Sequence, residues 1–184
     1  MAQSKNRRRA LVPGFTKAVR ARGRLAQAIG SFAMNFAILE KQVNHSVGVL
    51  LRIPTTSMVE LLTAAIRNVS TRLDILQSLV NGCKMSKRLR SDLLSSITEI
   101  RELNSDRNGL LHGNWSGYSP LTKEWPKIWP KTNQKFTRAI KLISVKSVQS
   151  CDRRCVREFV RLSKRIKRYD EYREKLEASH EKRA

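Results

Sequence analysis

Apolar residues recur every three or four positions over most of this chain, which is the period of one face of an α-helix. In the first such run they are Leu25, Ile29, Phe32, Phe36, Leu39, Val43, Val47 and Leu50. The run predicts a long helix that ends before Pro54, because the residue preceding a proline is pushed out of the α region.

A second helix is expected to begin at Ser57, a candidate N-cap, with Glu60 three residues later completing a capping box. Its apolar line consists of Leu62, Ala65, Ile66, Val69, Leu73, Leu76 and Val80. Asn81-Gly82 is expected to end this second helix. A third helix is expected to open near Ser86 and to weaken at Gly109 and Gly113. Its apolar line is Leu89, Leu93, Ile97 and Ile100.

The segment 113–134 has a different character, since it holds all three tryptophans and two Trp-Pro pairs. It predicts an irregular connection, and the stretch KFTRAIKLISV that follows is slightly more typical of a strand than of a helix. A last helix carries apolar residues on one face and a dense basic surface on the other. The apolar residues are Val148, Cys155, Phe159, Leu162, Ile166, Tyr169 and Leu176.

These elements predict an all-α fold, a bundle of four to five helices with an irregular loop and a short strand between the third and last long helices. The helical domain is expected to span residues 25–184. Residues 1–24 carry eight Lys/Arg and no acid, and Pro13 and Gly14 are expected to interrupt an early helix. We expect this segment to be a flexible basic arm, with helix starting no earlier than about Thr16.

The net charge of the chain indicates which classes of binding partner to expect. The chain has 37 Lys and Arg against 15 Asp and Glu, a formal net charge of +22, and 40% apolar residues. Such an excess favours polyanions, with nucleic acid first and an acidic membrane surface second. A solvated basic surface that meets an acidic protein is the plainer alternative. No run of about 18 apolar residues is present, so no spanning helix and no membrane partner are expected.

The three cysteines, Cys83, Cys151 and Cys155, have no paired spacing, which favours a reducing, cytoplasmic location. Cys151 and Cys155 lie four apart without a nearby histidine, and this favours two ordinary half-buried thiols over a zinc site. No metal and no cofactor are therefore expected.

Polar residues interrupt the apolar line of the third helix near its end. At about 100° per residue, Asn104, Arg107 and Asn108 fall within about 60° of Leu93, and His112 falls near 100°. Unpaired polar groups are costly in a dry core, so this pattern suggests a cleft, a dimer seam or an anionic ligand. The structural alternative is that Arg107 and His112 simply complement the dipole at a helix end, and from spacing alone it is the more common case.

The stretch Arg107-Asn108-Gly109-Leu110-Leu111-His112 resembles the R-x(4–6)-H motif of the HEPN superfamily. FAILEKQV in the first helix and HGNW after the motif are also similar to bacterial HEPN-like proteins of the ribonuclease and toxin type. The resemblance covers about residues 25–180. It implies a helical dimer whose two motifs face each other, and in many members a metal-independent endoribonuclease, including toxins and defence proteins. Other members only bind RNA, nucleotides or proteins.

On that pattern Arg107 and His112 would be catalytic, Asn108 would support them, and Asn104 and Glu40 would be further supporting residues. The chemistry suits RNA independently, because histidine moves protons near neutral pH and arginine stays charged against phosphoryl oxygens. The ribose 2′-hydroxyl would attack, leaving a 2′,3′-cyclic phosphate and a 5′-hydroxyl. The expected partners are RNA, a second copy of the chain and, for a toxin, a cognate antitoxin.

Other residues are candidates for RNA contact. The basic face of the last helix would track phosphates through Arg153, Arg154, Arg157, Arg161, Lys164 and Arg165. Trp115, with Tyr118, Trp125 and Trp129, would stack on bases or, more simply, anchor the loop. His45 lies away from the apolar line of its helix and is expected at the surface. His180 is expected to be exposed near the C-terminus.

Overall fold

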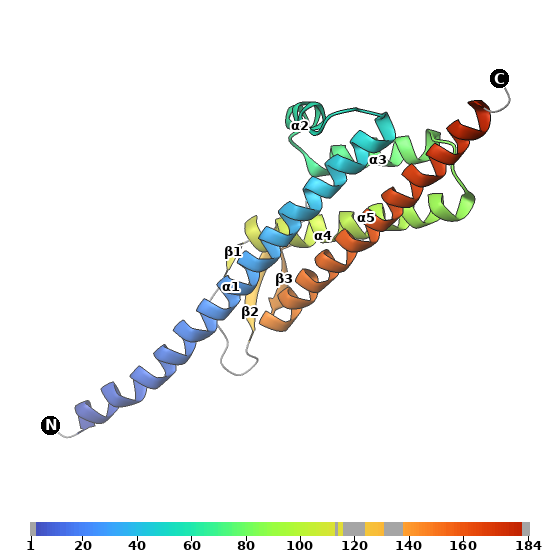
Figure 1. Ribbon diagram of the computed structural model, residues 1–184. Helices are drawn as coiled ribbons and strands as arrows, with labels where there is room; N and C mark the ends of the chain where they lie inside the picture. The colour runs from blue at the N-terminus through green and yellow to red at the C-terminus, as the bar shows by residue number, and fades with distance from the viewer. Residues whose placement is uncertain (1–2, 113, 116–123, 131–137, 182–184) are drawn as a thin grey trace. The chain divides into compact units, whose positions relative to one another are not determined.

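The computed structural model describes residues 3–112, 114–115, 124–130 and 138–181 (Figure 1). In chain order the elements are α1 (Gln3–Leu51), α2 (Thr56–Ala65), α3 (Val69–Gly82), α4 (Lys87–His112), β1 (Asn114–Trp115), β2 (Trp125–Pro130), β3 (Arg138–Ile143) and α5 (Val145–Glu181). Helices dominate and carry the core, so the all-α bundle predicted from the apolar period is confirmed.

The chain divides into two compact units, each built from separate stretches of sequence. Unit 1 comprises residues 1–33 and 107–152, and unit 2 comprises residues 34–106 and 153–184. Each is described by itself below. Within the described part of the chain no single helix has the length and apolarity of a membrane span, although α1 from Ala18 and α2 pass that test together as a bent pair.

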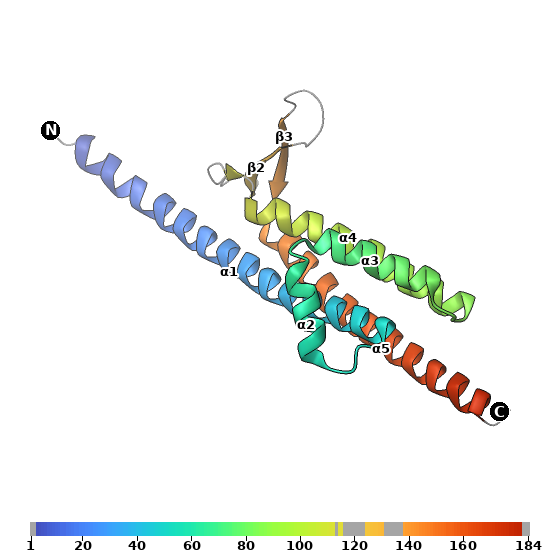
Figure 2. The same ribbon diagram turned by 90° about the horizontal axis from the view of Figure 1, so that it is seen from above.

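Unit 2 holds the larger apolar core, which comes from the C-terminal part of α1 together with α3, α4 and α5. Its apolar residues no more than 1% exposed are Phe36, Leu39, Val43, Leu73, Leu76, Val80, Leu93, Ile97, Ile100, Leu103, Cys155 and Leu162. Figure 2 shows α3 beside α4, and the ion pair between Arg101 Nη2 and Asp74 Oδ1 at 2.6 Å joins the same two helices. The apolar lines predicted for these helices are confirmed, whereas Leu62 and Ala65, which were predicted on the same line as Leu73, are exposed.

The first helix ends at Leu51, before Pro54 as expected, and its end is a Schellman motif. Arg52 has φ of 60°, and its N–H donates to Val49 O at 3.2 Å. The N–H of Ile53 donates to Gly48 O at 3.0 Å, which completes the pair of bonds that closes such helix ends. A left-handed arginine costs roughly 1 kcal/mol or more, so the geometry here comes from the surrounding bonds and not from a glycine.

The single helix expected from Ser57 to Val80 is two helices, so that prediction was wrong. The N-cap of α2 is Thr55, whose Oγ1 accepts from Met58 N at 3.3 Å, and α2 ends at Ala65. Asn68 then caps α3, with its Oδ1 accepting from Ser70 N at 2.9 Å. The Asn68 cap, together with the bond from Arg72 Nε to Ile66 O at 2.7 Å, stabilises the break, and the outer face of α2 stays exposed.

Gly48 lets α2 pack closely on the end of α1, from which it is bent by 111°. A Cβ atom at Gly48 would lie 2.4 Å from Cγ2 of Val59, far inside van der Waals contact. Val59 is 7% exposed and Thr63 is 3% exposed, so this contact holds the inner face of α2 against α1.

Ser86 caps α4 as expected, since its Oγ accepts from Leu89 N at 3.3 Å.

Unit 1 contains the N-terminal part of α1, the last turns of α4, the three strands and the first turns of α5. Its buried apolar residues are Ala21, Leu25, Ala28, Phe32, Leu110, Ile143 and Val148. Ser31 Oγ donates to Asp152 Oδ2 at 2.9 Å and joins α1 to α5. The helix α1 begins at Gln3 and continues through Pro13 and Gly14, so the expectation that helix would start no earlier than about Thr16 was wrong.

The strands form one antiparallel sheet in the order β1-β2-β3. The strand β3 lies within the stretch KFTRAIKLISV and confirms the expected strand there, whereas β1 and β2 fall in the segment expected to be irregular. Two prolines in β2 had argued against a strand, because proline cannot donate to a ladder. The partner β1 pairs only with Lys127 and Ile128, so the ladder on that edge does not extend to the prolines.

Candidate functional site

The residues of the Arg107–His112 motif occupy the last turns of α4, in unit 1. The helix continues unbroken through Gly109 to His112. On a continuous helix the Cα directions of Arg107 and His112 differ by about 140°. A single chain therefore presents the guanidinium and the imidazole on different faces of α4.

The motif is open to solvent. His112 and Asn108 are exposed, Arg107 is half-buried, and the neighbouring Leu110 is 5% exposed and anchors the turn. Arg107 Nη1 lies 3.4 Å from Asn108 Oδ1 and donates to it. The asparagine thus contacts the guanidinium, one of the two groups that it was expected to support.

The expectation that Asn108 lies on the inward stripe was wrong. Leu103 and Leu110 are buried, and they lie about 280° and 260° around the helix from Leu93. The buried sector of α4 is therefore centred some 30° from Leu93, on the side away from Asn108. Asn104, at 6% exposed, does lie inside this sector as predicted.

The two proposed supporting residues, Asn104 and Glu40, belong to unit 2. Asn104 Nδ2 donates to Ser70 Oγ at 3.4 Å and links α4 to α3. Glu40 is half-buried on α1. Asn104 therefore has a packing role within its own unit, which a buried amide requires.

The basic residues predicted on α5 separate into two groups. Arg154 contacts three carboxylates of α4, with Nε 2.7 Å from Glu99 Oε1, Nη2 2.9 Å from Glu102 Oε2 and Nη1 3.4 Å from Asp106 Oδ2. The hydrogen bond from Arg154 lowers the pKa of Glu99 below its usual range. Arg154 is neutralised by these acids, which favours a structural role for it over phosphate binding.

Arg165 is the second engaged cation, with a side chain only 17% exposed. Its Nη1 lies 3.4 Å from Glu158 Oε1 and donates to Ser96 Oγ, which in turn donates to Glu158 Oε1. Arg161 is more open, at 53% side-chain exposure, and its Nη1 lies 3.5 Å from Glu158 Oε2. Arg165 is therefore also unsuited to phosphate.

The second group consists of Arg153, Arg157 and Lys164, which are all exposed. Within the described part of the chain, none of them has an ion-pair partner within 4 Å or a side-chain hydrogen bond. These three remain candidates for contact with an anionic ligand.

Sequence analysis missed the buried carboxylate Glu158, which is 1% exposed. It lies three residues after Cys155 and four before Leu162, two positions that were placed on the inner face. This spacing was the available signal, but the surrounding arginines suggested a solvated basic surface. Glu158 and Ser96 instead join α5 to α4 through the core of unit 2.

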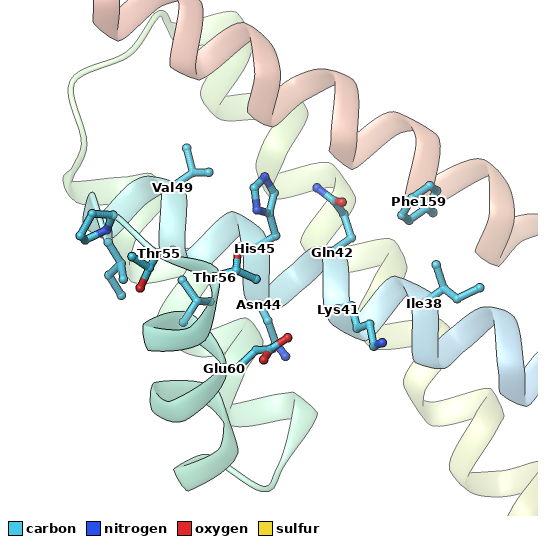
Figure 3. Close-up of a pocket in the computed structure, with 14 residues that line it drawn as sticks. Ile38, Lys41, Gln42, Asn44, His45, Val49, Thr55, Thr56, Glu60 and Phe159 are labelled. Atoms are coloured by element: carbon cyan, nitrogen blue, oxygen red, sulfur yellow. The ribbon is translucent and has the colours of Figure 1, made fainter.

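A pocket of about 430 Å³ lies between the end of α1, α2 and Phe159 of α5, all within unit 2 (Figure 3). Lys41, His45 and Glu60 supply its charged or titratable lining. His45 is exposed, as expected. No residue of the Arg107–His112 motif lines this pocket.

A second pocket of about 330 Å³ lies at the far end of unit 2, beside Arg52, Cys83 and Arg173. Burial, together with a hydrogen bond to Cys83, raises the pKa of Tyr169 to about 12. The phenol therefore stays protonated at neutral pH, and the cysteine beside it is a half-buried free thiol.

The aromatic candidates are only partly described. Trp115 in β1 and Trp125 in β2 are half-buried. Tyr118 and the side chain of Trp129 lie outside the described residues, as does the side chain of His180. Half-burial suits an anchoring role for the two tryptophans, and base stacking stays a prediction.

Cys151 is half-buried and Cys155 is fully buried, and both are free thiols. Among the described residues no group of three or more His, Cys, Asp or Glu side chains is placed to hold a metal ion. Comparison of the whole chain with protein-family models, curated proteins and solved structures gives no match.

Proposed function

We propose that this protein is a metal-independent endoribonuclease that cleaves single-stranded or loop RNA at a site built around Arg107 and His112. The observation that carries the proposal is the exposure of His112 and Asn108 on the last turns of α4, with Arg107 beside Asn108. An imidazole at this position is accessible to a polymeric substrate, and histidine is the side chain most often used to move protons in enzymes.

In this reaction the ribose 2′-oxygen forms a bond to phosphorus and the bond from phosphorus to the 5′-oxygen breaks. His112 takes the proton from the 2′-hydroxyl or delivers one to the departing oxygen. Arg107 neutralises the charge that develops on the phosphoryl oxygens, to which a guanidinium can bind through two parallel hydrogen bonds. The products are a 2′,3′-cyclic phosphate and a 5′-hydroxyl.

The roughly 140° between Arg107 and His112 argues that a second copy completes the site. A two-fold axis near the end of α4 would bring Arg107 of one protomer to His112 of its partner, as the HEPN resemblance implies. A cytoplasmic toxin or antiphage protein, held in check by a cognate antitoxin, would use such a site.

Metal-free cleavage is tested with a long unstructured RNA in EDTA, followed by analysis of the product ends. We expect cleavage to persist in EDTA and to give cyclic phosphate and 5′-hydroxyl ends. An oligonucleotide of the same sequence with 2′-deoxyribose throughout should stay intact, because it lacks the attacking group. Cleavage of the deoxy strand, or cleavage abolished by EDTA, would reject this chemistry.

A second candidate is an inactive RNA-binding module of the same fold. The exposed and unpaired Arg153, Arg157 and Lys164 favour it, because phosphate binding needs only such cations. Salt-sensitive RNA binding without any cleavage would select the module over the enzyme.

A further inference from the structure

One exposed line of cations runs along the part of α5 that belongs to unit 2. Its members are Arg153, Arg157, Lys164, Arg168 and Lys175, and we call them the α5 cation line. They are separated by four and seven residues in alternation, so all five fall within about 60° around the helix. The line is about 33 Å long at 1.5 Å per residue.

Glu99, whose pKa is lowered mainly by its hydrogen bond with Arg154, is also influenced by the charge of Arg157, but no carboxylate of the described residues pairs directly with this line. None of its five members has an ion-pair partner within 4 Å, whereas Arg154, Arg165 and Arg173 on other faces of α5 all contact acids. The one acid at its edge, Glu171, lies 4.0 Å from Lys167. The fold thus separates paired arginines, which bind the bundle together, from unpaired cations that face solvent.

The shape of the line favours a double-stranded ligand. Proteins that bind single strands combine a groove with aromatic side chains on which bases stack. The α5 cation line lies on the exposed face of a helix, and the exposed large apolar residue nearest to its centre is Val160. Tyr172 is the nearest exposed aromatic on α5, about 70° from the centre of the line. A-form duplexes are recognised largely through phosphates and overall shape, which suits a line of cations without a stacking surface.

We propose that the α5 cation line binds the double-stranded stem of a structured RNA, so that the substrate of the proposed ribonuclease is a stem with a single-stranded loop. The substrate class rests on the proposed function, whereas duplex binding by α5 does not. Contact with phosphates on a stem would be independent of sequence and strongly weakened by salt.

The test measures affinity for an RNA duplex and for an unstructured single strand of equal length, over a range of salt concentrations. All proteins carry His112→Ala so that neither RNA is cut. The test variant is Arg153→Gln/Arg157→Gln/Lys164→Gln. The control Lys84→Gln/Lys87→Gln/Arg88→Gln removes equal charge from exposed positions at the start of α4 and just before it. Binding of the same proteins to phosphatidylserine-containing vesicles is measured as a third comparison.

We expect the parent protein to prefer the duplex. The α5 variant should lose about tenfold or more in duplex affinity, and its slope of log affinity against log salt should fall by about 3, with little change in the control. A second variant, Arg168→Gln/Lys175→Gln, should lower the slope by about 2 and guards against a folding defect in the first.

Three results would overturn the inference: equal affinity for single strand and duplex, unchanged duplex binding in both α5 variants, or a loss confined to vesicle binding. The proposed ribonuclease activity is tested separately, because it would be rejected by the absence of cleavage in the protein with His112 intact.

Discussion

Replacing His112 with alanine is expected to slow RNA cleavage in EDTA by roughly 10²–10⁴-fold, the usual contribution of a positioned acid or base. The exposed imidazole has no hydrogen bond or ion pair among the described residues, so its loss should leave the thermal unfolding midpoint unchanged. Single-turnover cleavage rates and a melting curve measure the two effects on the same sample.

The matched control is His45→Ala, which removes an exposed histidine from α1 in unit 2. Its cleavage rate should equal that of the unmodified protein. Arg107→Ala should also lose about 10²-fold or more, because the charge forming on phosphorus would be unopposed. A His112→Ala protein that cuts as fast as the unmodified one would remove this histidine from the chemistry.

The second large effect is on stability. Replacing Glu158 with alanine is expected to lower the free energy of unfolding by about 3–5 kcal/mol, because breaking a buried charge pair leaves its partner uncompensated. Glu158 is 1% exposed and accepts from Ser96, and Arg165 lies against both. Among the described residues, Asp92, 3.9 Å from Arg165 Nη2, is the only other acid within 4 Å of this arginine.

Urea unfolding followed by circular dichroism measures the loss. Glu158→Gln keeps an acceptor for Ser96 and should fall between alanine and the unmodified protein. Glu171→Ala on the same helix breaks only the exposed contact with Lys167, and should change stability by less than about 0.5 kcal/mol. A loss below about 1 kcal/mol for Glu158→Ala would mean that this network does not hold α4 to α5.

The inner faces of the long helices could be predicted from sequence because burial follows the helical period. Phe36, Leu73 and Leu162, each at no more than 1% exposure, all belong to lines read from spacing alone. The break after α2 could not be predicted in this way, because the apolar line continues through Ile66. It depends on the Asn68 cap, a local hydrogen bond that competes with the helix.

The candidate site was predicted less completely than the fold. The pattern identified Arg107 and His112, but it set the inward direction of α4 at Leu93, whereas Leu103 and Leu110 define the buried sector. Sequence analysis also gave all the candidate cations on the basic face of α5 one common role, contact with phosphates. Which of its cations are free depends on the acids of α4, such as Glu99 and Asp106, and these come near only in the folded bundle.

The shared active site is tested most directly by mixing two inactive proteins, Arg107→Ala and His112→Ala, after unfolding and refolding them together. If each site takes its arginine from one protomer and its histidine from the other, half of the dimers are mixed and each has one intact site. The account predicts recovery of about a quarter of the unmodified cleavage rate in EDTA. A mixture as inactive as its two components, alongside an unmodified protein that cuts RNA, would contradict it.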